Sequence, residues 1–580
     1  MDFSGIDIGI FIGYICCIMG FGIWIANREK NVNSQDYFLA SKSLPWWAVG
    51  GSLIASNIST EQILGMNGTG YVAGMAVAAY ELMAAFTLII VAKFFLPVFI
   101  KKGIYSMPQF LEMRYNQGVR IGLAFFWVAL FVFINITSIF YLGGLATEAL
   151  TGVPMGYAIV GLVIYSATFS IFGGLKAVVW TDVIQAVVLV IGGLFAAYFV
   201  VSAVAGADGG FFAGLSTMFE KAPEKFDMIL SSDNPSYGDL PGIAVLIGGL
   251  WIANLYYWGL NQYIIQRALA AKNVHEAQKG VAFAGFLKLL MPLIAVLPGI
   301  AVFVLGGEID KPDEAFPWVL KNYVPIGLKG LTFAALIAAI GSSISSMVNS
   351  TSTIFTLDIY KTLINENASE KSLVSVGRIT AGAALIIGAL VAPALSSLDQ
   401  AFQFIQEFTG FIAPGILVVF VFGLFWKRAS ANAAMSVVIL SIPLSFALKY
   451  FFPELPFLDR MGFCFLLLSS LMLGVSLLEN SKAGGSKDIP YKLLVFGSIL
   501  LISIPSGFKI LIEDTEVSKW FGYVILGLSA VVAYVLFSEQ RADDPKAITI
   551  EKGLFKTDSF FNISAIAITL VLAVIYTLLW

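Results

Sequence analysis

The sequence predicts an all-α protein that crosses a membrane many times. Of its 580 residues, 58% are hydrophobic and only 12% are charged, whereas a soluble chain carries about twice that charged fraction. Mean hydropathy is +0.86. Long apolar segments recur from end to end, each near the roughly 20 residues that an α-helix needs to cross the hydrocarbon core. We therefore expect this chain to act within the membrane.

Charge and cysteine usage exclude several classes of function. The net charge is −3, without a basic tail or stripe, so nucleic acid is not an expected partner. Cys16, Cys17 and Cys464 lie in apolar segments and suit neither a disulfide framework nor a zinc site. His275 is the only histidine, which argues against histidine–metal chemistry. Because no nucleophile–base pair or metal cluster is recognisable, we expect no catalytic residues and no enzyme activity.

Apolar segments separated by charged residues predict about sixteen membrane spans. The first has no basic segment before it and is followed by "NREK", so it is interpreted as an uncleaved helix with its N-terminus outside. Lys and Arg are concentrated in the loops that this orientation places inside, and an even number of spans returns the C-terminus to the outside. The spans lie near 7–26, 44–73, 77–100, 120–147, 155–175, 178–204, 241–264, 281–306, 327–357, 375–396, 402–425, 430–451, 458–479, 492–512, 518–537 and 560–580.

Two spans carry polar residues and glycines where hydrocarbon is expected. The second contains "SLIASNISTEQILGMNGTGYVAG" and the seventh contains "GGLWIANLYYWGLNQY". An interrupted helix leaves carbonyl oxygens free to bind an ion, whereas a continuous helix does not. Since the two spans lie five apart, they predict an inverted repeat of five plus five helices whose first helices are both broken near the midplane. Ordinary helix packing through small residues is the alternative interpretation.

This repeat divides the chain into five segments. Residues 1–43 are expected to form an extra N-terminal helix and a cytoplasmic loop. The first repeat covers 44–204, an extracytoplasmic loop covers 205–240, and the second repeat covers 241–425. Peripheral transmembrane helices are expected over 426–580.

Five sequence blocks resemble the solute:sodium symporter family, specifically its bacterial sodium/glucose (sodium/galactose) cotransporter branch. The resemblance runs from about residue 35 to 450 and again over the last helix. It implies a leucine-transporter-like fold and a bacterial inner membrane location. Compared with that branch, the chain carries an additional helix pair between about 455 and 540. The blocks are "SLPWWAVGGSLIASNISTEQILGM", "GGLKAVVWTDVIQ", "GGLWIANLYYWGLNQYIIQR", "SSISSMVNSTSTIFTLDIYK" and "FQFIQEFTGFIAPGIL".

A serine-rich face of the ninth span predicts an ion site. Its residues are spaced i, i+3, i+4 and i+7 and so share one side of a helix. Uncharged oxygens on that face, together with carbonyls released by the break in the second span, suit a monovalent hard cation better than zinc or copper. Simple packing is the alternative. The face comprises Ala339, Ser342, Ser343 and Ser346, and the resemblance implies sodium ligation by the carbonyls of Ala55, Ile58 and Ala339 and the hydroxyls of Ser342 and Ser343.

The resemblance also implies a solute pocket formed by amide and charged side chains on five spans. Amides and carboxylates match the hydroxyls of a hexose, each of which donates and accepts. The alternative is that Glu81 and Lys288 form a structural ion pair. Ala84 stands where the galactose branch often has serine, which leaves the preferred epimer open. The implied sugar-binding residues are Gln62, Glu81, Asn254, Lys288 and Gln406.

Four residues are implied as gates above and below this pocket. The ring of Tyr257 would close the pocket from the cytoplasm. Met66, Tyr80 and Phe402 would close it from outside. Core packing is the alternative role for the aromatic side chains among them.

A second sodium site near the first remains open. Asp182 is an acidic residue at membrane depth and needs a cationic or hydrogen-bonding partner. Family members with a second ion imply that it would lie between Asp182 and Ser345 or Ser346. The galactose branch tends to have alanine at position 345. The alternative is that Asp182 only orients Ser342 or Ser343.

Sodium-driven transport is the function that these features predict together. Sodium would move inward with a neutral sugar of the galactose or glucose type by alternating access. A channel would need a continuous polar stripe or repeated filter loops, and neither is recognisable. Proton coupling through Glu81 or Asp182 is an alternative, as is another solute such as myo-inositol or an amino acid. The expected partners are sodium, a small sugar and the lipid bilayer. The oligomeric state is left open, with a functional monomer as one alternative.

Overall fold

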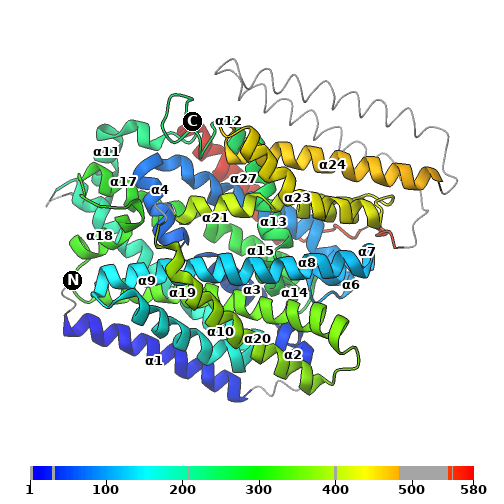
Figure 1. Ribbon diagram of the computed structural model, residues 1–580. Coiled ribbons are helices and arrows are strands. Elements are labelled where there is room, and N and C mark those ends of the chain that lie inside the picture. The colour runs from blue at the N-terminus through cyan, green and yellow to red at the C-terminus, as the bar shows by residue number, and fades with distance from the viewer. Residues whose placement is uncertain are drawn as a thin grey trace.

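The computed structural model describes residues 4–28, 33–59, 61–206, 209–397, 401–482, 546–551 and 553–580. These residues form helices and connecting loops (Figure 1). Within them, ten helices are long and apolar enough to cross a membrane, or eleven if one bent pair is counted as a span. The predicted spans near 492–512 and 518–537 lie outside the described residues, and so does most of the additional helix pair. The other predicted spans each coincide with helical segments, so the all-α prediction is confirmed.

Helices α1 to α10 occupy the N-terminal part of the chain. Two π-helical stretches, Val91–Phe95 and Phe131–Ile136, join α5 to α6 and α8 to α9 without interrupting the spans. The helices are α1 (Gly5–Arg28), α2 (Ser34–Leu39), α3 (Trp46–Asn57), α4 (Met66–Ala73), α5 (Ala79–Ile90), α6 (Leu96–Lys102), α7 (Met107–Arg114), α8 (Gln117–Leu130), α9 (Thr137–Thr151) and α10 (Met155–Val204).

The remaining helices include short ones in the loops after α10 and α17. These are α11 (Phe211–Lys221), α12 (Ile243–Ile247), α13 (Gly249–Leu260), α14 (Gln262–Leu269), α15 (Val274–Leu289), α16 (Met291–Ala295), α17 (Leu297–Val304), α18 (Ala315–Asn322), α19 (Leu328–Ile354), α20 (Glu370–Val391), α21 (Ala401–Gly410), α22 (Ala413–Phe425), α23 (Ala431–Phe451), α24 (Phe457–Lys482) and α27 (Ser559–Leu578).

Both predicted helix breaks are present. Helix α3 ends at Asn57, and Ile58 has extended backbone angles (φ −73°, ψ 90°). The chain becomes helical again in a π-helical turn over Glu61–Gly65 that leads into α4. In the seventh span, Asn261 (φ −78°, ψ 121°) separates α13 from α14. Each break carries polar side chains, as the sequence indicated.

A glycine divides α10 into the two spans predicted near 155–175 and 178–204. Gly174 lies in the left-handed half of the backbone map (φ 59°, ψ −166°), where a side chain is strained. A Cβ atom there would lie 2.6 Å from the carbonyl oxygen of Tyr37. Glycine is therefore required for the turn that begins the segment carrying Asp182.

Helix α19 lies at the centre of the molecule and α1 at its edge. In its most apolar stretch of 18 residues within 328–364, 94% of residues are buried, against 17% in the corresponding stretches of α1 and α27. Helix α1 is nevertheless attached to the start of α19. One carboxylate oxygen of Asp7 accepts the backbone N–H groups of Gly327 (2.7 Å) and Gly330 (2.8 Å). Asp7 therefore satisfies donors at the N-terminal end of α19 that have no partner within the helix.

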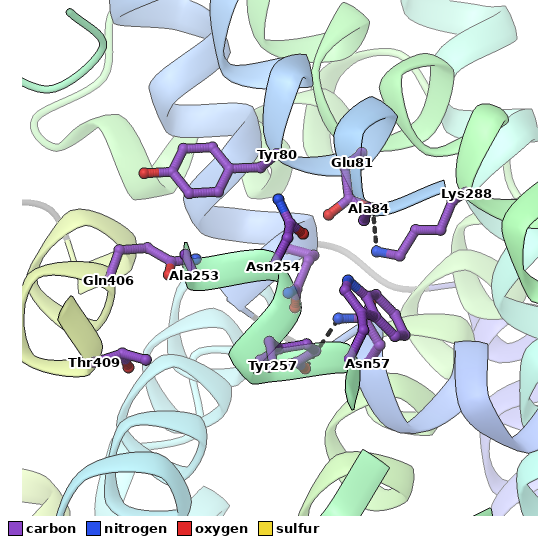
Figure 2. Close-up of a pocket in the computed structure, with 12 residues that line it drawn as sticks. Asn57, Tyr80, Glu81, Ala84, Ala253, Asn254, Tyr257, Lys288, Gln406 and Thr409 are labelled. Carbon is purple, nitrogen blue, oxygen red and sulfur yellow. Dashed lines mark hydrogen bonds and ion pairs between the residues drawn. The ribbon is translucent and has the colours of Figure 1, made fainter. Parts of the chain in front are cut away.

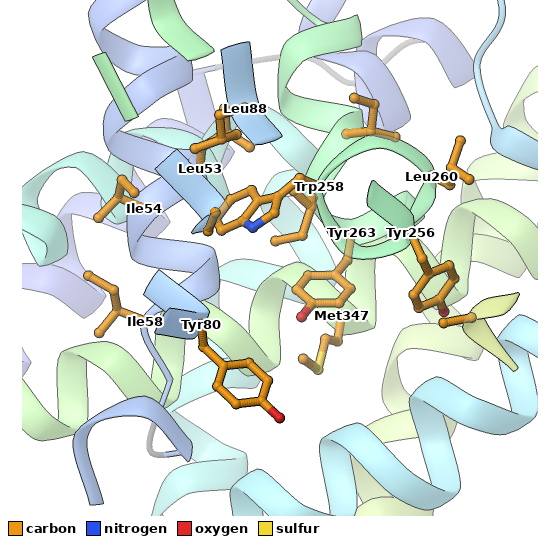
Figure 3. Close-up of a cluster of buried hydrophobic side chains, with 14 of the residues drawn as sticks. Leu53, Ile54, Ile58, Tyr80, Leu88, Tyr256, Trp258, Leu260, Tyr263 and Met347 are labelled. Carbon is orange, nitrogen blue, oxygen red and sulfur yellow. The ribbon is translucent and has the colours of Figure 1, made fainter. Parts of the chain in front are cut away.

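The two broken spans are held together by one large apolar cluster. Figure 3 shows side chains from α3, α5, α13, α14 and α19 gathered around the breaks. Burial of such side chains is the main source of the free energy that fixes neighbouring helices. The labelled members are Leu53, Ile54, Ile58, Tyr80, Leu88, Tyr256, Trp258, Leu260, Tyr263 and Met347.

Candidate functional site

A cavity lies between the broken spans and helices α5, α15 and α21, with about 440 Å³ of empty space that includes its opening to solvent. All five residues predicted to bind the solute line it, together with the predicted gate residues Tyr80 and Tyr257 (Figure 2). The lining residues are Asn57, Gln62, Tyr80, Glu81, Ala84, Ala253, Asn254, Tyr257, Trp258, Lys288, Gln406 and Thr409.

The two charged groups of the cavity neutralise each other. The ammonium of Lys288 on α15 is ion-paired and hydrogen-bonded to the Glu81 carboxylate on α5, and both side chains are buried. The ammonium also lies 5.0 Å from the centre of the Trp258 ring, at a distance typical of a cation–π contact. Since a buried charge is costly unless it is paired, this arrangement leaves the cavity polar but without net charge.

The amide side chains of the cavity are oriented by local hydrogen bonds. Gln62 Oε1 accepts the backbone N–H of Ser59 (3.0 Å) and its hydroxyl (2.8 Å). Asn254 Nδ2 donates to the carbonyl of Leu250 (3.2 Å). Within the described ranges, the Nε2 donor of Gln62 and the Oδ1 acceptor of Asn254 have no hydrogen-bond partner and are available to a ligand. Figure 2 shows Gln406 extending from α21 toward α13, on the other side of the cavity from Lys288.

The Tyr257 hydroxyl joins the two broken spans. It accepts Asn57 Nδ2 from α3 (2.9 Å) and the Tyr263 hydroxyl from α14 (2.5 Å). The ring of Tyr257 lines the cavity. Its position therefore depends on three helical segments that end at the two breaks.

The residues predicted for the outer gate differ in where they lie relative to the cavity. Tyr80 lines the cavity. Met66 is fully buried on α4 but does not line the cavity. The side chain of Phe402 lies outside the described residues. The outer gate role of Tyr80, Met66 and Phe402 stays a prediction.

Several lining residues were not predicted. Thr409 follows Gln406 by three residues, which places both on one face of α21, so helical spacing alone could have found it. Asn57 belongs to the polar segment at the α3 break and could also have been expected there. Ala253 and Trp258 carry no such signal, because an alanine or a tryptophan in an apolar span is usually packing.

The serine face of α19 lies against the end of α3. Ser343 Oγ donates to the carbonyl of Ser56 at 3.0 Å, and Ala339, Ser342 and Ser343 are fully buried. The Ser59 N–H that would close the last turn of α3 onto the Ala55 carbonyl donates to Gln62 instead. Among the described residues, no hydrogen bond reaches the carbonyl of Ala55 or Ile58. The carbonyls of Ala55 and Ile58, two of the predicted ligands, thus accept no hydrogen bond from the part of the chain that the structure describes.

The surroundings of Asp182 differ from a simple second ion site. One carboxylate oxygen accepts the Ser342 hydroxyl (2.6 Å), and the other accepts the Ser52 hydroxyl (2.6 Å). The guanidinium of Arg267 lies 3.7 Å from the second oxygen, and both side chains are fully buried. Arg267 is the cationic partner that Asp182 needs, and no feature of the sequence marks it for that role.

The two predicted serines do not contact Asp182 through a hydrogen bond. Ser345 Oγ donates to the carbonyl of Ser342 (2.9 Å). Ser346 Oγ is hydrogen-bonded to Ser56 Oγ (2.8 Å) and to Arg267. These contacts favour the alternative to a second ion, in which Asp182 only orients the Ser342 hydroxyl by accepting its hydrogen bond.

Comparisons with known proteins agree with this geometry. The family described as "Sodium:solute symporter family" matches residues 37–441. The sodium/glucose cotransporter of Vibrio parahaemolyticus is 47% identical over 597 residues, covering 100% of this chain and 98% of that protein. The sodium/myo-inositol cotransporter 2 of Mus musculus is 33% identical over 463 residues, covering 75% and 68%.

Solved structures confirm the predicted fold class. A sodium-coupled sialic acid symporter in a substrate-bound, outward-open state has a TM-score of 0.72 at 24% identity, covering 82% of this chain and 98% of that one. The nucleobase-cation-symport-1 transporter Mhp1 in a closed conformation has a TM-score of 0.50 at 16% identity, covering 76% and 95%. At these identities the likeness concerns the fold alone.

Proposed function

Because the chain belongs to the sodium:solute symporter family, it is a multi-pass membrane transporter that couples a solute to sodium, and we propose that this solute is a neutral sugar of the galactose or glucose type. The observation that carries the proposal is the cavity itself. It presents amides and one internally neutralised ion pair, without an excess charge that would select an ionic solute. The similarity to a sodium/glucose cotransporter supports the same solute class.

In this proposal, the cavity offers a sugar both kinds of hydrogen-bonding partner. The Gln62 Nε2 group donates, the Asn254 Oδ1 atom and the Glu81 carboxylate accept, and Gln406 does both. Lys288 pairs with this carboxylate and adds a further donor. The ring of Tyr257 covers the sugar on the cytoplasmic side, and Tyr80 covers it on the other. Met66 and Phe402 are proposed as further residues of the outer gate.

Sodium is proposed to bind between the broken α3 and the central α19. Its ligands are the carbonyls of Ala55, Ile58 and Ala339 and the hydroxyls of Ser342 and Ser343. The donor set is neutral and consists only of oxygen, which fits a hard monovalent ion. Inward sodium movement then supplies about 2.3 kcal/mol per 100 mV of membrane potential for sugar uptake.

We place the protein in the plasma (inner) membrane of a bacterium, with both termini extracytoplasmic and with the single chain as the functional unit. The bias of Lys and Arg among the loops supports this orientation.

Myo-inositol is the second candidate solute. Ala84 lines the cavity without a hydroxyl, so one contact that could distinguish sugar epimers is absent. A cyclic polyol without a ring oxygen could use the same amides, and relatives named sodium/myo-inositol cotransporters are 32–33% identical. A zwitterionic amino acid is disfavoured, because Lys288 and Glu81 already pair with each other.

The test is uptake into proteoliposomes that contain the purified protein. Radiolabelled galactose and glucose are supplied under an imposed sodium gradient and then under a proton gradient, with myo-inositol, proline and other sugars as competitors. We expect sodium-driven sugar accumulation that the proton gradient does not support and proline does not inhibit. Sodium-driven uptake of myo-inositol without sugar uptake would show that the transported solute is the polyol and not a sugar.

A further inference from the structure

Gln62 lies between the proposed sugar pocket and the proposed sodium site. Its Oε1 atom accepts the N–H of Ser59 at 3.0 Å and the hydroxyl of Ser59 at 2.8 Å. Its Nε2 atom has no hydrogen bond among the described residues, and the side chain lines the cavity. The Oε1 end of this amide is thus bonded to the α3 break, whereas the Nε2 end is left for a ligand in the cavity.

The bond from Ser59 determines where α3 stops. Ile58 N–H still donates to the carbonyl of Ile54 (2.8 Å), as in a continuing helix. The next donor, Ser59 N–H, turns to the Gln62 side chain instead of to the Ala55 carbonyl. A carbonyl that loses its helical donor can ligate a cation, and Ala55 is a proposed sodium ligand.

Removing the Oε1 acceptor of Gln62 changes which group accepts the Ser59 N–H. Ser59 is buried, and a buried backbone N–H that loses its partner seeks another acceptor. The nearest acceptor in a helical continuation is the Ala55 carbonyl four residues earlier. The Gln62 side chain therefore competes with the Ala55 carbonyl for one proton donor.

We propose that Gln62 is the positioning residue that couples the two sites: its Oε1 atom keeps the Ala55 carbonyl free for sodium while its Nε2 atom binds the sugar. A sugar bound to Nε2 immobilises the amide in the orientation that holds Ser59. By thermodynamic linkage, sodium binding raises sugar affinity by the same factor as sugar binding raises sodium affinity. The inference rests on the proposed sodium and sugar sites.

The same contacts have a simpler structural role. Ser59 Oγ also accepts the N–H of Glu61 (3.1 Å), so "STEQ" over residues 59–62 resembles a capping box at the start of the second half-helix. A capping box alone would stabilise that helix without affecting sodium. Sodium affinity measured without sugar is therefore the property that separates the two roles.

The experiment compares two substitutions of Gln62 with one of Gln406. Sodium binding to purified protein is measured with ²²Na⁺ in the absence and presence of galactose. Gln62→Leu removes both functions of the amide, whereas Gln62→Glu keeps an acceptor for Ser59 and loses the Nε2 donor. Gln406→Leu is the matched control, because Gln406 lines the same cavity but is not bonded to the α3 break.

We expect sodium binding without sugar to weaken about tenfold in Gln62→Leu, which corresponds to about 1.4 kcal/mol. Gln62→Glu should bind sodium at least as tightly as the wild type, and galactose should no longer enhance that binding. Gln406→Leu should weaken galactose binding and leave sodium affinity without sugar unchanged. Thermal unfolding of each variant shows whether it is folded.

Two outcomes would overturn the coupling role. Wild-type sodium affinity in Gln62→Leu would leave Gln62 as a sugar ligand and helix cap only. An equal loss of sodium affinity in Gln62→Leu and Gln62→Glu would mean that the Oε1 acceptor is not what matters. Ser343→Ala tests the sodium site itself. If Ser343→Ala and Gln62→Leu both bind sodium normally, the proposed ion site is wrong. If Ser343→Ala loses sodium binding and Gln62→Leu does not, the ion site stands and only the coupling role of Gln62 is wrong.

Discussion

Ser345→Ala is expected to leave the number of sodium ions moved per sugar unchanged at one. A second sodium between Asp182 and the serines of α19 was left open by the sequence. In the structure, the guanidinium of Arg267 lies 3.7 Å from an oxygen of Asp182. The hydroxyl of Ser345 donates to the Ser342 carbonyl instead of facing Asp182. A protein cation therefore stands where the second ion would be required.

The free-energy cost of binding a second sodium at Asp182 follows from the distance between Asp182 and the Arg267 guanidinium. An ion bound to Asp182 would lie roughly 4–6 Å from the guanidinium, where two unit charges repel by about 3–4 kcal/mol at an effective dielectric constant of ~20. That energy corresponds to roughly 100- to 1,000-fold weaker binding. The Ser52 and Ser342 hydroxyls already donate to the carboxylate, so few of its lone pairs remain for an ion.

Reversal potentials in proteoliposomes directly measure the number of sodium ions moved per sugar. Sugar gradients are imposed at fixed sodium gradients, and the membrane potential at which net flux stops is recorded for wild type and Ser345→Ala. Each additional sodium contributes about 2.3 kcal/mol per 100 mV, so ratios of one and two are well separated. A ratio of two in the wild type that falls to one in Ser345→Ala would refute the electrostatic argument.

Three further substitutions test the remaining assignments. Gln406→Ala should weaken sugar binding by about 1–3 kcal/mol in calorimetry while sodium affinity without sugar changes little; unaltered sugar uptake would count against the pocket. Ser343→Ala should raise the sodium concentration for half-maximal uptake, and a wild-type sodium dependence would place the ion elsewhere. Tyr257→Phe leaves the Asn57 amide and the Tyr263 hydroxyl without their acceptor, which costs about 1–3 kcal/mol, so steady-state sugar accumulation should fall while exchange continues. Full accumulation in that variant would assign Tyr257 to packing.

The breaks and the pocket could be predicted because their signal is local. Polar residues and glycines inside an apolar span are costly unless they serve a purpose, and the structure has breaks at Ile58 and Asn261 where such residues gather. The pocket residues came from a family resemblance, and their common cavity agrees with it. The capping pattern "STEQ" was also legible in the sequence but was not recognised.

Pairings between distant segments could not be predicted in the same way. Asp182 clearly needed a partner, yet nothing in the sequence selects Arg267 over the other cations, because their approach depends on how α10 and α14 pack around α19. The attachment of Asp7 to the start of α19 could not be predicted for the same reason, because it also depends on how distant helices pack. An aspartate near the end of a peripheral helix normally indicates only a solvated terminus.

These contacts indicate which side of the sodium site changes shape. Helix α19 is buried along nearly its whole length and is held at its start by two hydrogen bonds to Asp7. Helix α3, in contrast, ends at a break whose geometry depends on the side chain of Gln62. A sodium ion that joins a fixed helix to an interrupted one exerts its effect mainly on the interrupted one. We therefore expect sodium to order the α3 break, and with it Asn57 and the Tyr257 gate, before it displaces α19. Hydrogen exchange at residues 55–62 should slow on sodium addition, while exchange at 335–346 stays unchanged; the opposite pattern would place the moving element in α19.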